Sequence, residues 1–280
     1  MRAAASTIAI LAAAVMALSA VLLLPRLNDP AGAVWDESYY LGASARYQLG
    51  RSQFASHPPL GLMLIAGADA AYGAVTGHPR AHRDLESLAA TKAVRGEQIP
   101  PGYDFTGIRI GSAIAGVIGA GLFFALMLQL SGAPFAAAAL SALYVFDTAL
   151  IAQFRAAQLD GFQIAFALIA LNCAVAGMRR PGWGWALGFG AAVGAATMVR
   201  ANAVLLAAAG PFLLWAAWRV AGWRRAISVA QGGGIGFAGM VAGVFALHLA
   251  VAQLPPDQNI PAGFGDAKWV SPQLDDYFAH

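Results

Sequence analysis

The chain is poor in cysteine and in charge. It has one cysteine, Cys173, among 280 residues, and 11% of its residues are charged. A single cysteine forms no intramolecular disulfide, and because Cys173 lies inside an apolar run, we interpret it as a packing residue rather than a nucleophile or metal ligand. The net charge is only +3, from scattered basic residues. Nucleic-acid binding requires a concentrated basic surface, so a nucleic-acid partner is excluded.

Apolar residues dominate the chain instead. They make up 59% of it, with a mean hydropathy of +0.62, which exceeds what the core of a soluble protein of this length requires. Backbone that crosses a bilayer must satisfy its own hydrogen bonds, which helices do within one segment. We therefore predict an all-α, polytopic membrane protein.

Seven apolar segments approach the ~20 residues that a helix needs to cross a bilayer. We place the spans at residues 8–24, 107–130, 133–152, 160–178, 183–199, 201–218 and 228–252. Residues 17–20 also resemble a signal-peptide cleavage site. The first run continues unbroken to Leu24, however, so we expect a retained span with a cytoplasmic N-terminus.

Residues 25–104 separate the first two spans, and we expect this outer loop to carry two helices at the membrane surface. Glu37–Leu49 has an amphipathic pattern with tyrosines at headgroup depth. Pro59–Val75 is more apolar, contains Asp69, and either spans the membrane or lies in its interface. Spanning would reverse every later segment and place the later arginine clusters outside, so the positive-inside rule favours the interface.

This orientation separates the charges by sign. The arginines of the later connections become cytoplasmic: Arg179, Arg180, Arg219, Arg224 and Arg225. All 14 acidic residues then lie on or near the outer side. We therefore predict a membrane module over residues 1–254 and an extracytoplasmic tail over 255–280. The run Gly232–Gly236 lacks a strand-turn-helix setting, so we interpret it as close helix packing, not a phosphate loop.

Several charged or polar side chains at the outer face are candidates for chemistry. They are Asp36, Glu37, His57, Arg109, Arg155, Asp160 and Arg200. Alone, each charged group at a span end also fits an interfacial side chain or a structural ion pair. Together, three arginines and at least two carboxylates at one membrane face suit a lipid-linked phosphate. A sugar on such a phosphate carries its own leaving group, so one carboxylate base suffices to accept the proton of an incoming hydroxyl.

Four stretches then carry a family resemblance. They are the Asp36-Glu37 pair, the turn His57-Pro58-Pro59-Leu60-Gly61, Tyr103–Arg109 with Ser112-Ala113, and Asp147–Arg155 with Leu159-Asp160. Their order and spacing resemble the protein O-mannosyltransferases and their bacterial relatives, the phospholipid carrier-dependent glycosyltransferases of the membrane GT-C class. The resemblance implies a GT-C-type helical bundle in the inner (plasma) membrane. It also implies inverting transfer of mannose from a polyprenyl-phosphate donor to a protein serine or threonine at the extracytoplasmic face.

The resemblance also implies roles for the outer residues. Asp36 matches the catalytic base. Glu37 beside it points about 100° away on a helix, so we expect it to support binding or orientation. Arg109 matches a family arginine and is expected to make a structural or phosphate contact. Arg155 and Asp160 are expected to organise the cavity.

His57 and Arg200 complete the predicted substrate site. We expect His57 to fix its loop by hydrogen bonding rather than to act as a base, because Pro58-Pro59 rigidifies it beside the acidic pair. The family commonly has lysines where this chain has Leu62 and Arg200. Arg200 keeps the charge but changes the geometry, whereas Leu62 leaves the sugar and acceptor open.

Alternatives remain at this stage. The chain ends at His280, short of the further spans of such enzymes, so we expect a truncated product that is a glycosyltransferase or a non-catalytic partner subunit. The acceptor is a protein or a glycolipid such as lipid A, and homo- or hetero-oligomers both remain open. A transporter is disfavoured because the charges lie at the outer ends and no repeat is evident. No cofactor is certain, but Asp36 with other outer carboxylates leaves a divalent cation open.

Overall fold

The computed structural model describes residues 2–51, 57–91, 93–94 and 96–252. Within these ranges the protein is all-α, as predicted. The helices are α1 (Arg2–Leu23), α2 (Glu37–Gln48), α3 (Pro59–Thr76), α4 (His82–Ala89), α5 (Thr106–Ser131), α6 (Pro134–Val145), α7 (Thr148–Arg155), α8 (Asp160–Arg179), α9 (Trp183–Val199) and α10 (Gly210–Val251), with short 3-10 helices η1 (Gly96–Gln98) and η2 (Ala201–Ala209).

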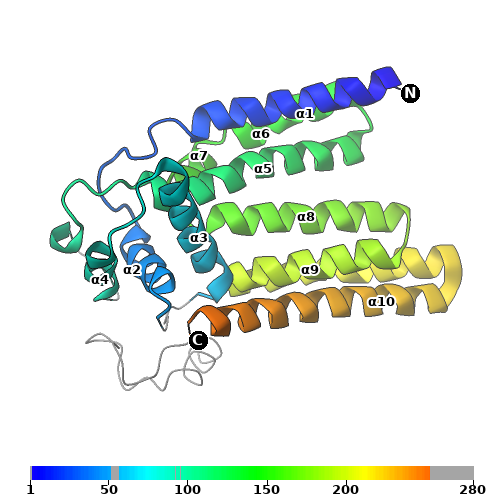
Figure 1. Ribbon diagram of the computed structural model, residues 1–280. Coiled ribbons are helices and arrows are strands. Elements are labelled where there is room, and N and C mark those ends of the chain that lie inside the picture. The colour runs from blue at the N-terminus through cyan, green and yellow to red at the C-terminus, as the bar shows by residue number, and fades with distance from the viewer. Residues whose placement is uncertain (1, 52–56, 92, 95, 253–280) are drawn as a thin grey trace.

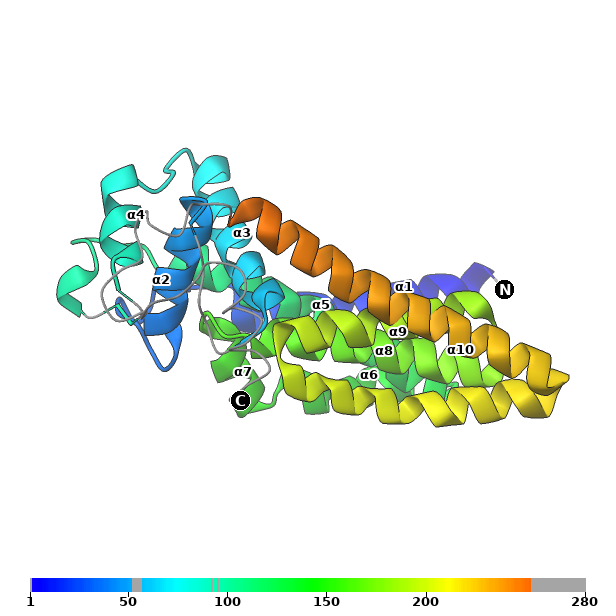
Figure 2. The ribbon, with the colours of Figure 1, turned by 90° about the horizontal axis from the view of Figure 1, so that it is seen from below.

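The long helices lie side by side in one bundle, while α2, α3 and α4 gather at one end of it (Figure 1). Helix α10 is bent back on itself at Ala221 and Gly222, and Gly222 has a φ of 74°, which glycine adopts readily. Its two halves run back along the bundle as a hairpin (Figure 2). This bend separates the two last predicted spans, 201–218 and 228–252, and all seven predicted spans coincide with helical segments.

Membrane length and composition agree with this arrangement. Five described helical segments are long and apolar enough to cross a membrane, and α6 and α7, which meet at a 64° bend, make a sixth if taken as one span. That count includes α3 and takes residues 201–251 as one segment. Helix α9 is equally apolar but has 17 residues.

Helix α3 runs steeply across the end of the bundle rather than along it (Figure 1). Its N-terminal turn packs on the end of α9, where a Cβ on Gly61 would lie 3.1 Å from a Val199 methyl. Further along, a Cβ on Gly111 of α5 would lie 2.8 Å from the Ala68 Cβ. Both regions of α3 thus contact the same end of the bundle, and the interfacial placement of α3 stays a prediction.

Small residues allow α9 and α10 to pack backbone against backbone. A Cβ on Gly232 would lie 2.8 Å from the Trp183 carbonyl oxygen, and a Cβ on Gly236 would collide with the Leu187 carbonyl. The interpretation of this glycine run as a helix-packing surface is confirmed. Cys173 is half-buried, and its Sγ would lie 3.1 Å from a Cβ on Gly188, so it packs α8 against α9 as expected.

Candidate active site

The predicted site residues lie at the end of the bundle that α2 and α3 cover, but they do not form one cluster. Glu37 and Arg109 form a closed pair inside the protein. Asp36, His57, Asp160 and Arg200 form a partly exposed group beside it. We call the second set the open group, and we describe the two in turn because their surroundings differ.

The closed pair uses every donor of its guanidinium. Arg109 Nε and Nη2 donate to the two carboxylate oxygens of Glu37 at 2.8 and 2.7 Å. Arg109 Nη1 donates to the carbonyls of Leu27 and Pro30, and Nη2 donates again to the carbonyl of Gly32. An arginine has five N–H donors, so none is left over. Arg109 therefore ties α5 to α2 and to the loop that follows α1.

The Glu37 carboxylate is equally saturated. Besides the two Arg109 bonds, it accepts the backbone N–H of Val34 at 2.9 Å and that of Ala157 at 2.7 Å. The Glu37 side chain is 0% exposed and that of Arg109 is 1% exposed. Of the roles expected from the sequence, these contacts fit orientation for Glu37 and a structural contact for Arg109, because both side chains are occupied by protein partners. They fix the geometry of the loops around the open group.

Arg155 has a comparable structural task. Its Nη1 donates to the carbonyls of Leu22 and Leu23, and its Nη2 donates to that of Arg26. These carbonyls lie at and just beyond the C-terminal end of α1, where helix carbonyls lack intrahelical partners and a cation is favourable. Arg155 thus caps α1, and its expected role in organising the cavity stays a prediction.

In the open group, Arg200 and Asp160 form an ion pair between the end of α9 and the start of α8. Arg200 Nη2 lies 2.9 Å from Asp160 Oδ2, and the two side chains are 25% and 27% exposed. Asp36 stands at the N-cap of α2, where its side chain is exposed and makes no capping hydrogen bond. The open group therefore contains the exposed Asp36 carboxylate, which caps no helix, and the Arg200 guanidinium, which the Asp160 carboxylate holds in place.

Electrostatics join Asp36 and His57 to this ion pair. Burial lowers the pKa of His57, and the nearby Arg200 lowers it further, while Asp36 and Asp160 oppose the shift. The pKa of His57 therefore lies below its ordinary value near 6.5, and the ring is neutral at neutral pH. The hydrogen-bonding role expected for His57 stays a prediction.

Tyr40 belongs to the open group, although the sequence reasoning did not single it out. Burial first, and Asp36 next, raise its pKa to about 12, while Arg200 lowers it. Its ring centre lies 6.5 Å from that of His57. The buried hydroxyl approaches Arg200 but makes no hydrogen bond of ordinary geometry within the described chain. The sequence did contain an indication of this position: Tyr40 follows Asp36 by four residues, and residues four apart lie on the same face of a helix.

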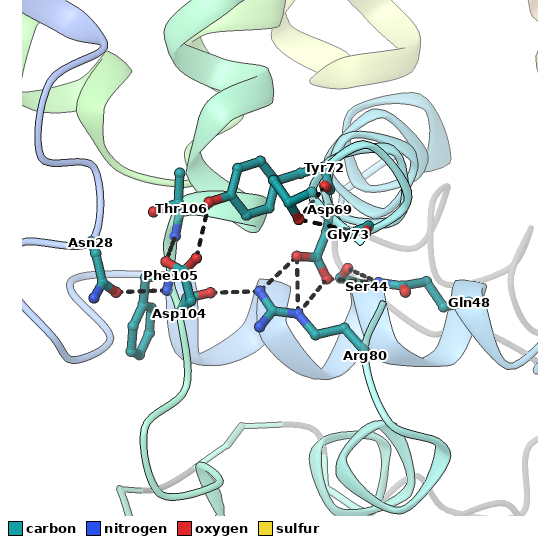
Figure 3. A network of polar contacts seen from close by, with 11 residues as sticks. Asn28, Ser44, Gln48, Asp69, Tyr72, Gly73, Arg80, Asp104, Phe105 and Thr106 are labelled. Atoms are coloured by element: carbon teal, nitrogen blue, oxygen red, sulfur yellow. Dashed lines mark hydrogen bonds and ion pairs between the residues drawn. The ribbon is translucent and has the colours of Figure 1, made fainter. Parts of the chain in front are cut away.

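A third polar network holds the outer helices together (Figure 3). Asp69 of α3 accepts a hydrogen bond from Arg80 Nη2 at 2.8 Å and one from Gln48 of α2 at 2.8 Å. Arg80 Nη2 also donates to the Asp104 carbonyl at 2.5 Å, and the Tyr72 hydroxyl donates to the Asp104 carboxylate at 3.1 Å. This explains the acidic residue in an apolar helix: Asp69 faces the protein.

Metal-binding side chains do not converge in the described ranges, where no three His, Cys, Asp or Glu residues group as ligands. The side chains of the open group are of the kinds used for acid-base and anion-binding chemistry. A carboxylate and a guanidinium at one water-facing edge are able to accept a proton and to hold a phosphate.

Comparisons with known proteins bear on this arrangement. Residues 13–252 match the family model described as dolichyl-phosphate-mannose-protein mannosyltransferase. Among solved structures, the chain is similar to the S. cerevisiae protein O-mannosyltransferase Pmt1-Pmt2 complex bound to the sugar donor, with a TM-score of 0.67 and 20% identity. That match covers 87% of this chain and 33% of the yeast chain, so this chain spans about a third of the yeast length. None of the curated proteins compared with the chain matches it.

Proposed function

Since the chain belongs to the dolichyl-phosphate-mannose-protein mannosyltransferase family, we propose that it transfers mannose from a polyprenyl-phosphate donor to a serine or threonine hydroxyl of a protein. The observation that carries the proposal is the open group. Asp36 is exposed at the N-cap of α2, within electrostatic range of the same histidine and tyrosine as the Arg200–Asp160 pair. The yeast complex was solved with its sugar donor, which supports a donor of the same class.

The proposed reaction is a single displacement. The acceptor oxygen attacks the anomeric carbon while Asp36 accepts the hydroxyl proton. The bond from the anomeric carbon to the phosphate oxygen breaks, and polyprenyl phosphate leaves with the bonding electrons. Arg200, held by Asp160, stabilises the negative charge on that phosphate. Attack from the face opposite the leaving group inverts the configuration at the anomeric carbon.

The closed pair serves this reaction indirectly. Glu37 is the residue after Asp36, and its four hydrogen bonds fix the first turn of α2. Position and direction of the catalytic carboxylate are therefore set by a neighbour that does not react. We place this end of the bundle at the extracytoplasmic face of the plasma membrane, because the arginine clusters of the opposite end suit the cytoplasmic side.

Asp36→Asn tests the proposal. Membranes carrying the protein are incubated with labelled polyprenyl-phosphate mannose, and the labelled product is identified. A lost general base costs about 10²- to 10⁴-fold in rate, while the melting temperature should stay unchanged because the side chain is exposed and caps nothing. Glu97→Gln, an exposed carboxylate on η1, is the matched control and should retain full transfer.

The labelled product also decides between acceptors. Label in a protein band supports the proposal. Label in a glycolipid would show that the acceptor is a glycolipid and not a protein. Full activity of the Asp36→Asn protein would rule out Asp36 as the base. No transfer by a folded wild-type protein with either acceptor would indicate a non-catalytic partner subunit. The yeast match is a complex of two mannosyltransferases, so we propose that this chain too acts in an oligomer, with itself or with a relative.

A further inference from the structure

The end of the bundle opposite the open group is strongly basic and aromatic. It comprises the α8–α9 connection and the bend of α10, at the right of Figures 1 and 2. Helix α8 has 20 residues between Asp160 and Arg179, which places the two ends about 30 Å apart at 1.5 Å per residue. That separation matches the apolar thickness of a bilayer, so this end lies at the other membrane surface.

Five arginines of this end have no acidic counterpart nearby. They are Arg179, Arg180, Arg219, Arg224 and Arg225. The sequence contains no aspartate or glutamate between positions 161 and 256, and the first residues of α1 and the α5–α6 turn, which share this end, have none either. The positive charge of this surface is therefore uncompensated within the described protein.

A cavity of about 560 Å³ opens between the two basic connections. It is lined by Arg180, Pro181, Gly182, Gly184, Trp185 and Arg225. Arg225 is oriented by its Nε and Nη2, which donate to the Pro181 carbonyl at 3.0 and 2.7 Å. Its Nη1 and the exposed Arg180 guanidinium make no hydrogen bond or ion pair with any described residue. The cavity thus has N–H donors that no protein acceptor uses.

Exposed tryptophans are concentrated at the end of the bundle that holds this cavity, and one of them, Trp185, lines it. Five of the seven in the chain lie at this end, all at least 43% exposed: Trp183, Trp185, Trp215, Trp218 and Trp223. The guanidinium of Arg219 lies 5.4 Å from the Trp215 ring centre and that of Arg224 lies 5.9 Å from the Trp223 ring centre. Tryptophan rings of this kind anchor a protein at the level where lipid phosphates lie.

We propose that this cavity binds the headgroup phosphate of an anionic phospholipid from the leaflet opposite the open group. Arg180 and Arg225 hold the phosphate oxygens, and the indole of Trp185 packs on the glycerol region. Charge complementarity, unused arginine donors and a cavity at headgroup depth converge on this ligand. The site is independent of the proposed sugar transfer, since none of its residues belongs to the open group.

Native mass spectrometry of the purified full chain tests the site, with phosphatidylglycerol and phosphatidylcholine of the same acyl chains added in turn. We expect retention of phosphatidylglycerol over phosphatidylcholine. Arg180→Gln should weaken it about fivefold, the effect of one cation at a lipid surface. Arg83→Gln removes an exposed arginine at the other end, where its side chain is 90% exposed, and should change nothing.

Gly184→Leu tests the contribution of the cavity shape without changing any charge. A Cβ at Gly184 meets no atom within 4 Å, and Gly184 lines the cavity. We therefore expect a leucine here to occupy part of the cavity and to weaken retention. Equal losses in Arg180→Gln and Arg83→Gln, or full retention in Gly184→Leu, would overturn the proposal in favour of diffuse attraction. Displacement of the lipid by an equal concentration of inorganic phosphate would overturn its assignment to a lipid.

Discussion

Asp36 and Glu37 are adjacent and chemically alike, yet they lie in opposite environments. Glu37 is fully buried and accepts four hydrogen bonds, two of them from Arg109. Asp36 is exposed, with no side-chain cap bond. The same contrast separates the two arginine–carboxylate pairs, since Arg109–Glu37 is closed and Arg200–Asp160 is about a quarter exposed. A saturated buried pair fixes geometry, whereas a partly exposed pair remains in contact with solvent, as the proposed role of Arg200 requires.

The largest expected effect concerns the side of the membrane on which the open group lies, because labelling from one side either occurs or does not. Cys173→Ser removes the only cysteine of the chain, which allows single cysteines to be introduced. Trp35→Cys and Arg83→Cys replace exposed residues before α2 and after α3. Both should react with a membrane-impermeant maleimide on intact cells, because in the proposed topology α3 lies in the membrane interface and both positions are outside.

Ala133→Cys, in the exposed turn between α5 and α6, is the matched control and should react only after permeabilisation. The reverse labelling pattern would place the open group in the cytoplasm and end the proposed extracytoplasmic reaction. Labelling of positions 35 and 83 from different sides would contradict the interfacial placement of α3.

Loss of the closed pair should give the largest change in stability. Glu37→Ala leaves the Arg109 guanidinium buried without its counter-charge, which typically costs about 3–5 kcal/mol. We expect a large fall in melting temperature in detergent, together with loss of transfer. Asp36→Asn is the control next to it and should melt like the wild type. If the two variants melt alike, the distinction between a structural and a reactive carboxylate is wrong.

The fold was predictable to a large extent, because its determinants are local. Apolar runs marked the seven segments that are found as helices, and the clustered glycines at 232–236 indicated backbone contact. The apolar run around Cys173 also indicated its packing role. Each of these inferences depends on residues close together in sequence, so no tertiary contact had to be known.

Which polar residues have structural roles and which face the open group was not predictable in the same way. Three of the five Arg109 bonds go to backbone carbonyls of residues 27–32, and Arg155 binds three carbonyls at the end of α1. Backbone acceptors leave no mark in a sequence, so both arginines resembled phosphate ligands as much as Arg200 did. Asp36 and Glu37 were separable only through their angle on a helix.

In the open group, Arg200 should matter for the rate rather than for stability. Arg200→Gln removes a charged hydrogen-bond donor from the departing phosphate, which is worth about 1.5–3 kcal/mol, or roughly 10- to 100-fold in transfer rate. Arg200→Lys keeps the charge without the planar fork and should recover part of the loss. Both are measured with the labelled donor at saturating concentration.

Arg51→Gln is the matched control, because it also removes an arginine from an ion pair, with Glu86 at 2.5 Å, outside the open group. It should leave the transfer rate unchanged. An equal loss in Arg51→Gln, or no loss in Arg200→Gln, would show that Arg200 is a structural residue like Arg109.

The smallest predicted effect concerns His57 and acid. Its folded pKa is lowered by burial and then by Arg200, whereas the unfolded chain protonates near pH 6.5. Above that pH both states are neutral and His57 costs no stability. As the pH falls below 6.5, the unfolded state binds the proton more readily, so stability is lost through this group.

His57→Gln should therefore flatten the fall of melting temperature between pH 7 and pH 5, and Arg200→Gln should flatten it partly by raising the pKa of His57. His82→Gln, at a position 78% exposed, should leave the wild-type slope, and if it flattens the curve as much as His57→Gln does, the acid response does not originate in the open group.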